Sequence, residues 1–217
     1  MLQSGKASDD DEHPETWAET LKDARRERIL TAAAQVFEER GLDEASMRKI
    51  ATQAGCTTGA IYPLFKSKEA MYAELLSRSL DDLRRRMDAV DPELSPTERV
   101  RVCARIIMDF YLEKPSEFAL SFYLSAGLKR KGVGSELNSV LNDRLAEIRR
   151  VAEKDFAACI GPERAAEATT GLFAHLTGLL VLQLRGRFRV FAGEPRDLLR
   201  TYLDAVLGPD HEPQGEI

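Results

Sequence analysis

The sequence has few of the residues that build disulfide frameworks and metal sites. Three of its 217 residues are cysteine (Cys56, Cys103 and Cys159), and they lie far apart without a CxxC pair. An odd number of widely spaced cysteines is typical of free thiols in a reducing compartment. The three histidines show no ligand spacing with one another or with the cysteines. We therefore predict no metal site and no cofactor.

A long apolar run is also missing. The residues Asp9, Asp10, Asp11 and Glu12 stand where a secretory signal would need an apolar stretch. The most apolar window, around Leu179–Leu184, is shorter than a membrane span. We expect a soluble, cytoplasmic protein with no membrane partner.

Period-2 alternation between turn signals is absent as well, so strands are not expected. Apolar residues recur at helical spacing along most of the chain, and Gly and Pro residues separate the helical segments. The pattern predicts an all-α protein. In its second half we expect helices over about 97–113, 115–128, 135–160, 162–186 and 194–207.

The formal net charge of −5 is unevenly distributed. Residues 1–21 hold one Lys against six acidic residues, whereas residues 22–70 hold nine Lys and Arg against seven acidic residues. The first segment has little to bury, and we expect a flexible acidic arm with Trp17 packing back on the first helix. The slightly basic segment that follows is compatible with a nucleic-acid partner.

Two short helices joined by a tight turn are predicted between Gly41 and Leu76. The first opens at Ser46, and Gly55 interrupts it. Thr57 can cap the second, which is expected to reach about Leu64. Its outer face is small, with Thr58, Gly59 and Ala60, so that its backbone and first amides can approach bases and phosphates. This spacing is that of a helix-turn-helix, whose second helix lies in the DNA major groove.

The segment resembles the DNA-binding domain of the TetR (tetracycline-repressor) family of bacterial regulators. About fifty residues carry the family pattern in order and register: Ile29, Ala32, Ala33, Phe37, Gly41, Ser46, Ile50, Ala51, Ala54, Gly55, Thr57, Gly59, Tyr62, Phe65, Lys68 and Glu69. Two positions depart from it. Cys56 stands where Val is usual, and Leu64, preceded by Pro63, stands where His is frequent, which alters the far end of the recognition helix.

The resemblance implies DNA-binding roles for nine residues. Ser46 and Thr57 match phosphate-binding helix caps, Tyr62 matches a tyrosine whose hydroxyl reaches the DNA backbone, and Lys68 matches a lysine that contacts a phosphate. The positions expected to face base edges are Arg48, Thr58, Gly59, Ala60 and Pro63. A solvated charge at Arg48 and a packing role for Gly59 are the alternatives.

The region after Asp91 matches no fixed motif. The resemblance implies that its last two helices pair with a second subunit and that its middle helices enclose a small-molecule pocket. We expect the homodimer interface at Leu172, Leu176, Leu179, Leu199, Tyr202, Leu203 and Val206. We expect an apolar or aromatic effector near Phe110, Phe118, Phe122, Tyr123 and His175. An aromatic core and purely intramolecular packing are the alternatives.

These observations predict a sequence-specific DNA-binding transcriptional regulator, a repressor that a small ligand releases from palindromic double-stranded operator DNA. The expected organisation is a flexible arm (1–21), a three-helix helix-turn-helix domain (22–70), a helical effector-binding and dimerisation domain (71–208) and a flexible tail (209–217). An enzyme and a helical adaptor without DNA function are the alternatives. No catalytic constellation supports the enzyme, and DNA binding would exclude the adaptor.

Overall fold

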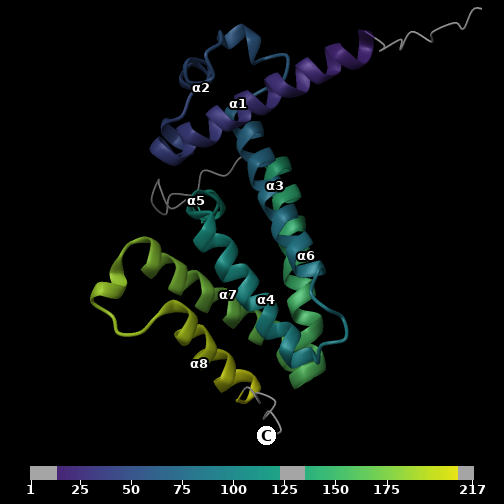
Figure 1. The fold of residues 1–217 in the computed structure, drawn as a ribbon, viewed down its shortest axis with the longest axis vertical. Coiled ribbons are helices and arrows are strands. Elements are labelled where there is room, and N and C mark those ends of the chain that lie inside the picture. Colours follow the sequence, from purple (N-terminus) through teal and green to yellow (C-terminus); the bar gives the residue numbers. More distant parts are fainter. Residues whose placement is uncertain (1–13, 123–134, 210–217) are drawn as a thin grey trace, which may run out of the picture. The chain divides into compact units, whose positions relative to one another are not determined.

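The computed structural model describes the backbone of residues 14–122 and 135–209 (Figure 1). The α-helices are α1 (Pro14–Glu44), α2 (Met47–Gln53), α3 (Lys68–Asp88), α4 (Pro96–Glu113), α5 (Pro115–Phe122), α6 (Ser135–Ile160), α7 (Pro162–Leu184) and α8 (Pro195–Leu207), and the 3₁₀ helices are η1 (Thr58–Ala60) and η2 (Arg187–Arg189). These residues include no strand, and the predicted all-α fold is confirmed. The part of the expected 115–128 helix beyond Phe122 lies outside the described residues.

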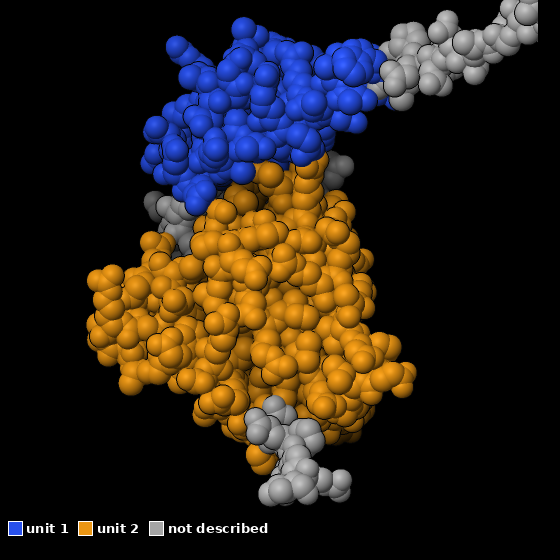
Figure 2. Space-filling model, in the orientation of Figure 1, with its two compact units in different colours: residues 1–71 blue, residues 72–217 orange. Residues whose placement is uncertain are grey.

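The chain divides into two compact units, residues 1–71 and 72–217 (Figure 2). The division falls inside α3, one residue beyond the expected boundary between 70 and 71. Each unit has its own core, so each is described by itself.

In unit 1, α1 begins earlier than the sequence pattern indicates. Residues 14–21, which were assigned to the flexible arm, are helical. Pro14 suits a first helical turn because its missing N–H has no partner there anyway. Trp17 is 67% exposed, so the expectation that it packs back on the helix is wrong. The regular helix ends at Gly41, whose φ of 72° is a left-handed conformation that favours glycine.

Helix α4 lies at the centre of unit 2 and contacts α5, α6, α7 and α8. Its start is fixed by a capping box, in which Ser95 and Glu98 each bind the other's backbone N–H. Further along, the buried guanidinium of Arg101 lies 2.7 Å from Asp204 on α8 and donates to the carbonyl of Gly208. These contacts fix the end of α8 against the core.

The side chains expected at the dimer interface are mostly core residues of the single chain. The buried ones are Leu172, Leu176, Leu179, Leu199 and Leu203, whereas Tyr202 and Val206 are half-buried. These five leucines are therefore already packed in the core of one chain, and the interface stays a prediction. Helix α7 is apolar over much of its circumference, so its sequence does not tell the inner face from the outer one, whereas α8 is amphipathic.

Candidate DNA-binding segment and ligand cavity

The first helix of the predicted helix-turn-helix forms as expected. Ser46 has extended backbone angles, and its hydroxyl oxygen accepts a hydrogen bond from the Lys49 N–H at 3.3 Å. Ser46 is therefore the N-cap of α2. The turn after α2 is made at Gly55, which has a φ of 64°, and Gln53 is tied to Gln35 of α1 by a 2.7 Å hydrogen bond. Both ends of α2 are thereby fixed.

The second helix is shorter and tighter than predicted. Residues 58–60 form the 3₁₀ helix η1, and turns follow up to Leu64. Its hydrogen bonds include Ile61 N–H to Thr58 O at 3.0 Å and Leu64 N–H to Ile61 O at 2.8 Å. Pro63 has no N–H, so a regular α-helical bond to the Gly59 carbonyl cannot form. The prediction of a regular helix over 57–64 is therefore wrong.

Two buried side chains, Ile61 and Phe65, anchor this segment in the core of unit 1. Its other predicted DNA-binding residues lie at the surface: Thr57, Gly59, Tyr62 and Pro63 are exposed, as is Arg48 on α2, and Thr58 and Ala60 are half-buried. Thr57 makes no side-chain capping bond. The segment therefore presents a small surface with one aromatic hydroxyl.

Arg26 of α1 holds the end of this segment, a role that sequence reasoning missed. Its guanidinium donates to the Leu64 carbonyl at 3.0 Å and lies 4.3 Å from the centre of the Phe65 ring. The carbonyl bond satisfies an acceptor next to the proline break, and the cation favours the face of the ring. Helix α1 contains several arginines, and nothing in the sequence distinguishes Arg26 from the others.

Lys68 has a contact that the family resemblance does not imply. Its ammonium group donates to the carbonyls of Leu42, Asp43 and Ala45 at 2.6, 3.2 and 2.9 Å. These carbonyls lie just after the helix-ending Gly41 and have no regular helical partners. Since an ammonium group has three N–H donors, a phosphate contact would need one of these bonds to open.

Unit 2 contains an apolar cavity of about 200 Å³. Its walls come from five helices, with Leu76, Leu80 and Leu83 (α3), Ile107 and Tyr111 (α4), Phe118 and Ser121 (α5), Leu141, Asn142, Leu145 and Ile148 (α6), and Phe173, Leu176, Thr177 and Leu180 (α7). None of the lining residues that the structure describes is charged. An occupant must therefore be apolar where it enters the cavity.

Polar groups in the cavity are few and partly satisfied. The Tyr111 hydroxyl lies 3.5 Å from the Ser121 hydroxyl, which donates to the Glu117 carbonyl at 2.9 Å. Burial raises the pKa of Tyr111, so its hydroxyl stays protonated at neutral pH. Asn142 on the facing wall adds an amide. These groups can orient a ligand without holding a full charge.

The residues predicted to bind the effector are dispersed. Phe118 lines the cavity and packs edge-to-face on Tyr111, with ring centres 5.3 Å apart. Phe110 is buried and does not line it, and His175 lies elsewhere, stacked on Tyr202 with ring centres 4.3 Å apart. The Phe122 side chain and all of Tyr123 lie outside the described part.

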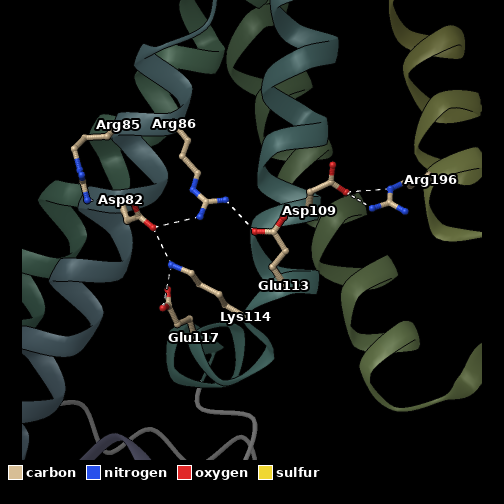
Figure 3. Close-up of polar contacts among 8 residues, drawn as sticks. All are labelled: Asp82, Arg85, Arg86, Asp109, Glu113, Lys114, Glu117 and Arg196. Carbon is tan, nitrogen blue, oxygen red and sulfur yellow. Dashed lines mark hydrogen bonds and ion pairs between the residues drawn. The ribbon is translucent and has the colours of Figure 1, made fainter. Parts of the chain in front are cut away.

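Polar contacts join α3 to α4 and α5 on one flank of this cavity (Figure 3). Lys114 lies 2.8 Å from Asp82 and 3.6 Å from Glu117, and Arg86 lies 3.1 Å from Glu113. The hydrogen bond from Lys114 holds the pKa of Asp82 below its ordinary value, and the same bond raises the pKa of Lys114. Both groups are therefore charged at neutral pH.

A metal centre is not indicated by these contacts. Within residues 14–122 and 135–209, no group of three or more His, Cys, Asp or Glu side chains could hold a metal ion. Helix α7 is long and apolar enough to cross a membrane by length and composition alone. Four of its leucines, Leu172, Leu176, Leu179 and Leu180, lie in the core of unit 2.

Comparison with known proteins shows to which family the chain belongs. Residues 29–75 match the model of the tetR family of bacterial regulatory proteins, and residues 100–206 match that of the tetracyclin repressor-like C-terminal domain. The chain belongs to the tetR family. It is therefore a DNA-binding transcriptional regulator, as the helix-turn-helix pattern predicts.

Its relatives include an uncharacterized HTH-type transcriptional regulator, YdgC, of Bacillus subtilis, 28% identical over 72% of this chain and 81% of that protein. The HTH-type transcriptional repressor KstR2 of Mycobacterium tuberculosis is 44% identical over 36% of this chain and 40% of its own length. A structure of FadR from Bacillus subtilis in complex with stearoyl-CoA has a TM-score of 0.66 at 17% identity, covering 85% of this chain and 98% of that one.

We predict that Lys68→Met destabilises unit 1 by about 1–3 kcal/mol, because three carbonyls lose their donor. Thermal and denaturant unfolding of the variant would measure the loss. Lys66→Met is the matched control, since Lys66 is exposed and close by. If Lys68→Met left stability unchanged and only weakened DNA binding, the three carbonyl bonds would be unimportant in solution.

Proposed function

We propose that this regulator is a cytoplasmic repressor that binds palindromic operator DNA as a homodimer and is released by a ligand with an apolar chain. The observation that carries the ligand class is the uncharged lining of the cavity in unit 2. Repression is supported by the 44% identity to KstR2, a transcriptional repressor, over a stretch of 79 residues. In this proposal the surface from Arg48 to Pro63 contacts the operator.

One feature of the cavity favours an acyl chain over a compact aromatic molecule. Leucines from α3, α6 and α7 dominate its walls, and they offer apolar area without flat stacking surfaces. About 0.8 kcal/mol is gained for each methylene group that leaves water. The FadR structure of similar fold holds stearoyl-CoA, which combines such a chain with a charged head group. The charged head would remain outside a cavity that has no charged lining residue.

For the homodimer, the outer face of α7 and α8 is a better candidate than the predicted leucines. Gly171 lets the Tyr202 side chain cross α7, because a Cβ atom there would lie 2.7 Å from the tyrosine oxygen. Beside it, Ala174 and Gly178 are exposed at helical spacing on α7, and Ala205 is exposed on α8. Small exposed residues on two adjacent helices allow the helices of a second copy to approach closely.

The operator contacts can be tested on DNA selected from a random pool, with affinities measured by fluorescence anisotropy at fixed salt. Tyr62→Phe should weaken binding about tenfold for all sequences alike, because a hydrogen bond to a phosphate is lost. Tyr62 is 57% exposed, so the fold should not suffer. Thr58→Ala should instead change the preferred bases. The opposite pattern would refute the assigned roles.

For the ligand, we predict that Leu145→Trp lowers the affinity for long-chain acyl-CoA probes at least tenfold while operator binding persists. Leu145 lines the cavity and is 49% exposed, so a larger side chain can fill the cavity without unfolding the core. Val140→Trp is the control, on the same helix and 47% exposed but outside the lining. Thermal shifts over a series of acyl-chain lengths provide the measurement. Equal losses in both variants would place the chain elsewhere.

For the dimer, we predict that Ala174→Arg and Gly178→Arg produce monomers in light scattering and reduce operator affinity strongly. Each would bury an unpaired charge between two copies. The control is Gln183→Arg, nine residues beyond Ala174 and so about half a turn around α7. Dimers that survive both substitutions would move the interface off this face. Arginine at Leu199 or Leu203 is unsuitable, since both leucines are buried within one chain.

A further inference from the structure

A second hollow in unit 2 shares no lining residue with the apolar cavity. It has a volume of about 530 Å³ and lies between the end of α3, the connection after α3, the start of α4 and the middle of α6. We call it the α3–α6 groove. Its floor carries Met87 and Cys103, both buried. Burial raises the pKa of the Cys103 thiol to about 11, so the floor is uncharged at neutral pH.

An ion pair between half-buried Arg99 and buried Asp155 fixes the shape of the groove. Asp155, only 6% exposed, accepts hydrogen bonds from Nε and Nη2 of Arg99 at 2.9 and 2.7 Å. The remaining Nη1 of Arg99 donates to the carbonyls of Pro92 and Leu94. One guanidinium therefore holds α6, α4 and the connection between α3 and α4 together. These charge-assisted hydrogen bonds fix the backbone around the groove, whereas the Arg150 and Lys154 side chains on its α6 wall are exposed.

The stripe of α6 that faces the groove carries charges with no partner. Glu147, Arg150 and Lys154 line the groove on one side of the helix, with Val151 between them. None of the three forms a hydrogen bond or ion pair with a residue that the structure describes. Arg150 and Lys154 are four residues apart, a spacing at which like charges repel. Glu147, three residues before Arg150 on the same stripe, offsets one of the two positive charges, and an anion between Arg150 and Lys154 would offset the other.

We propose that the α3–α6 groove binds a small organic carboxylate with an apolar body. Its carboxylate is held by Arg150 and Lys154, and its body covers Met87 and Val151. A guanidinium binds a carboxylate through two parallel N–H bonds, which favours Arg150 as the main contact. The site is distinct from the cavity for the acyl chain, because the cavity offers no charge and the groove offers two unpaired cations.

The test uses the methyl groups of methionine in the full-length protein. The chain has five methionines, and Met87 is the one that lines the groove. With ¹³C-methyl methionine, titration of 4-propylbenzoate should shift the Met87 signal, which Met87→Leu assigns. The uncharged amide of the same compound should bind at least tenfold more weakly. A Met87 signal that does not move, or an amide that binds as tightly as the acid, would overturn the proposal.

Matched variants on α6 locate the charge. Arg150→Gln with Lys154→Gln should weaken 4-propylbenzoate at least tenfold, and both residues are exposed, so the fold is retained. The control is Arg149→Gln, about 100° around α6 from Arg150, where Arg149 pairs with Glu153. Unchanged methyl signals of the free variants verify folding. Equal affinity in the double variant and the wild type would refute the site. Neither result depends on operator or acyl-chain binding, so the proposed function is tested separately.

Discussion

The break between α4 and α5 at Lys114 is the constraint on which the cavity depends. Its N–H donates to the Phe110 carbonyl at 3.1 Å and its carbonyl accepts from the Glu117 N–H at 3.0 Å, so one residue ends α4 and starts α5. Pro115 disfavours helical angles at Lys114, which has φ −127° and ψ 68°. The resulting bend sets Phe118 against Tyr111 on the cavity wall. The Lys114 ammonium group also binds Asp82 and so ties α3 to the junction of α4 and α5.

A second proline has the same kind of influence in unit 1. Pro63 removes one backbone donor and leaves a 3₁₀ helix and turns where a regular recognition helix was predicted. Short segments of this kind have little stability of their own. The buried side chains of Ile61 and Phe65 anchor the segment in the core of unit 1, and Arg26 binds its end. Its geometry is therefore determined by side chains of α1 as much as by its own sequence.

Much of the fold could be predicted because local signals and packing agree. Gly41 ends α1, Ser46 caps α2, and Gly55 makes the turn after α2, each for a reason visible in the sequence. The tertiary contacts could not be predicted in this way. Lys68 is one position of the family motif, yet its ammonium group donates to three backbone carbonyls. These carbonyls come together only because of the path that the chain takes after Gly41. The nearly uniform apolar surface of α7 likewise concealed that Leu172 and Leu176 face inward.

The chemistry of unit 2 is divided between two hollows that share the helices α3, α4 and α6. On one side these helices present leucines, and the resulting cavity excludes charge. On the other side half-buried Arg99 pairs with buried Asp155, and Arg150 and Lys154 have no partner among the residues that the structure describes. A helix that is apolar on one face and charged on another can line both hollows, because different sequence positions form its two faces. Because α3 borders both hollows, a ligand in either one contacts the helix that continues into unit 1.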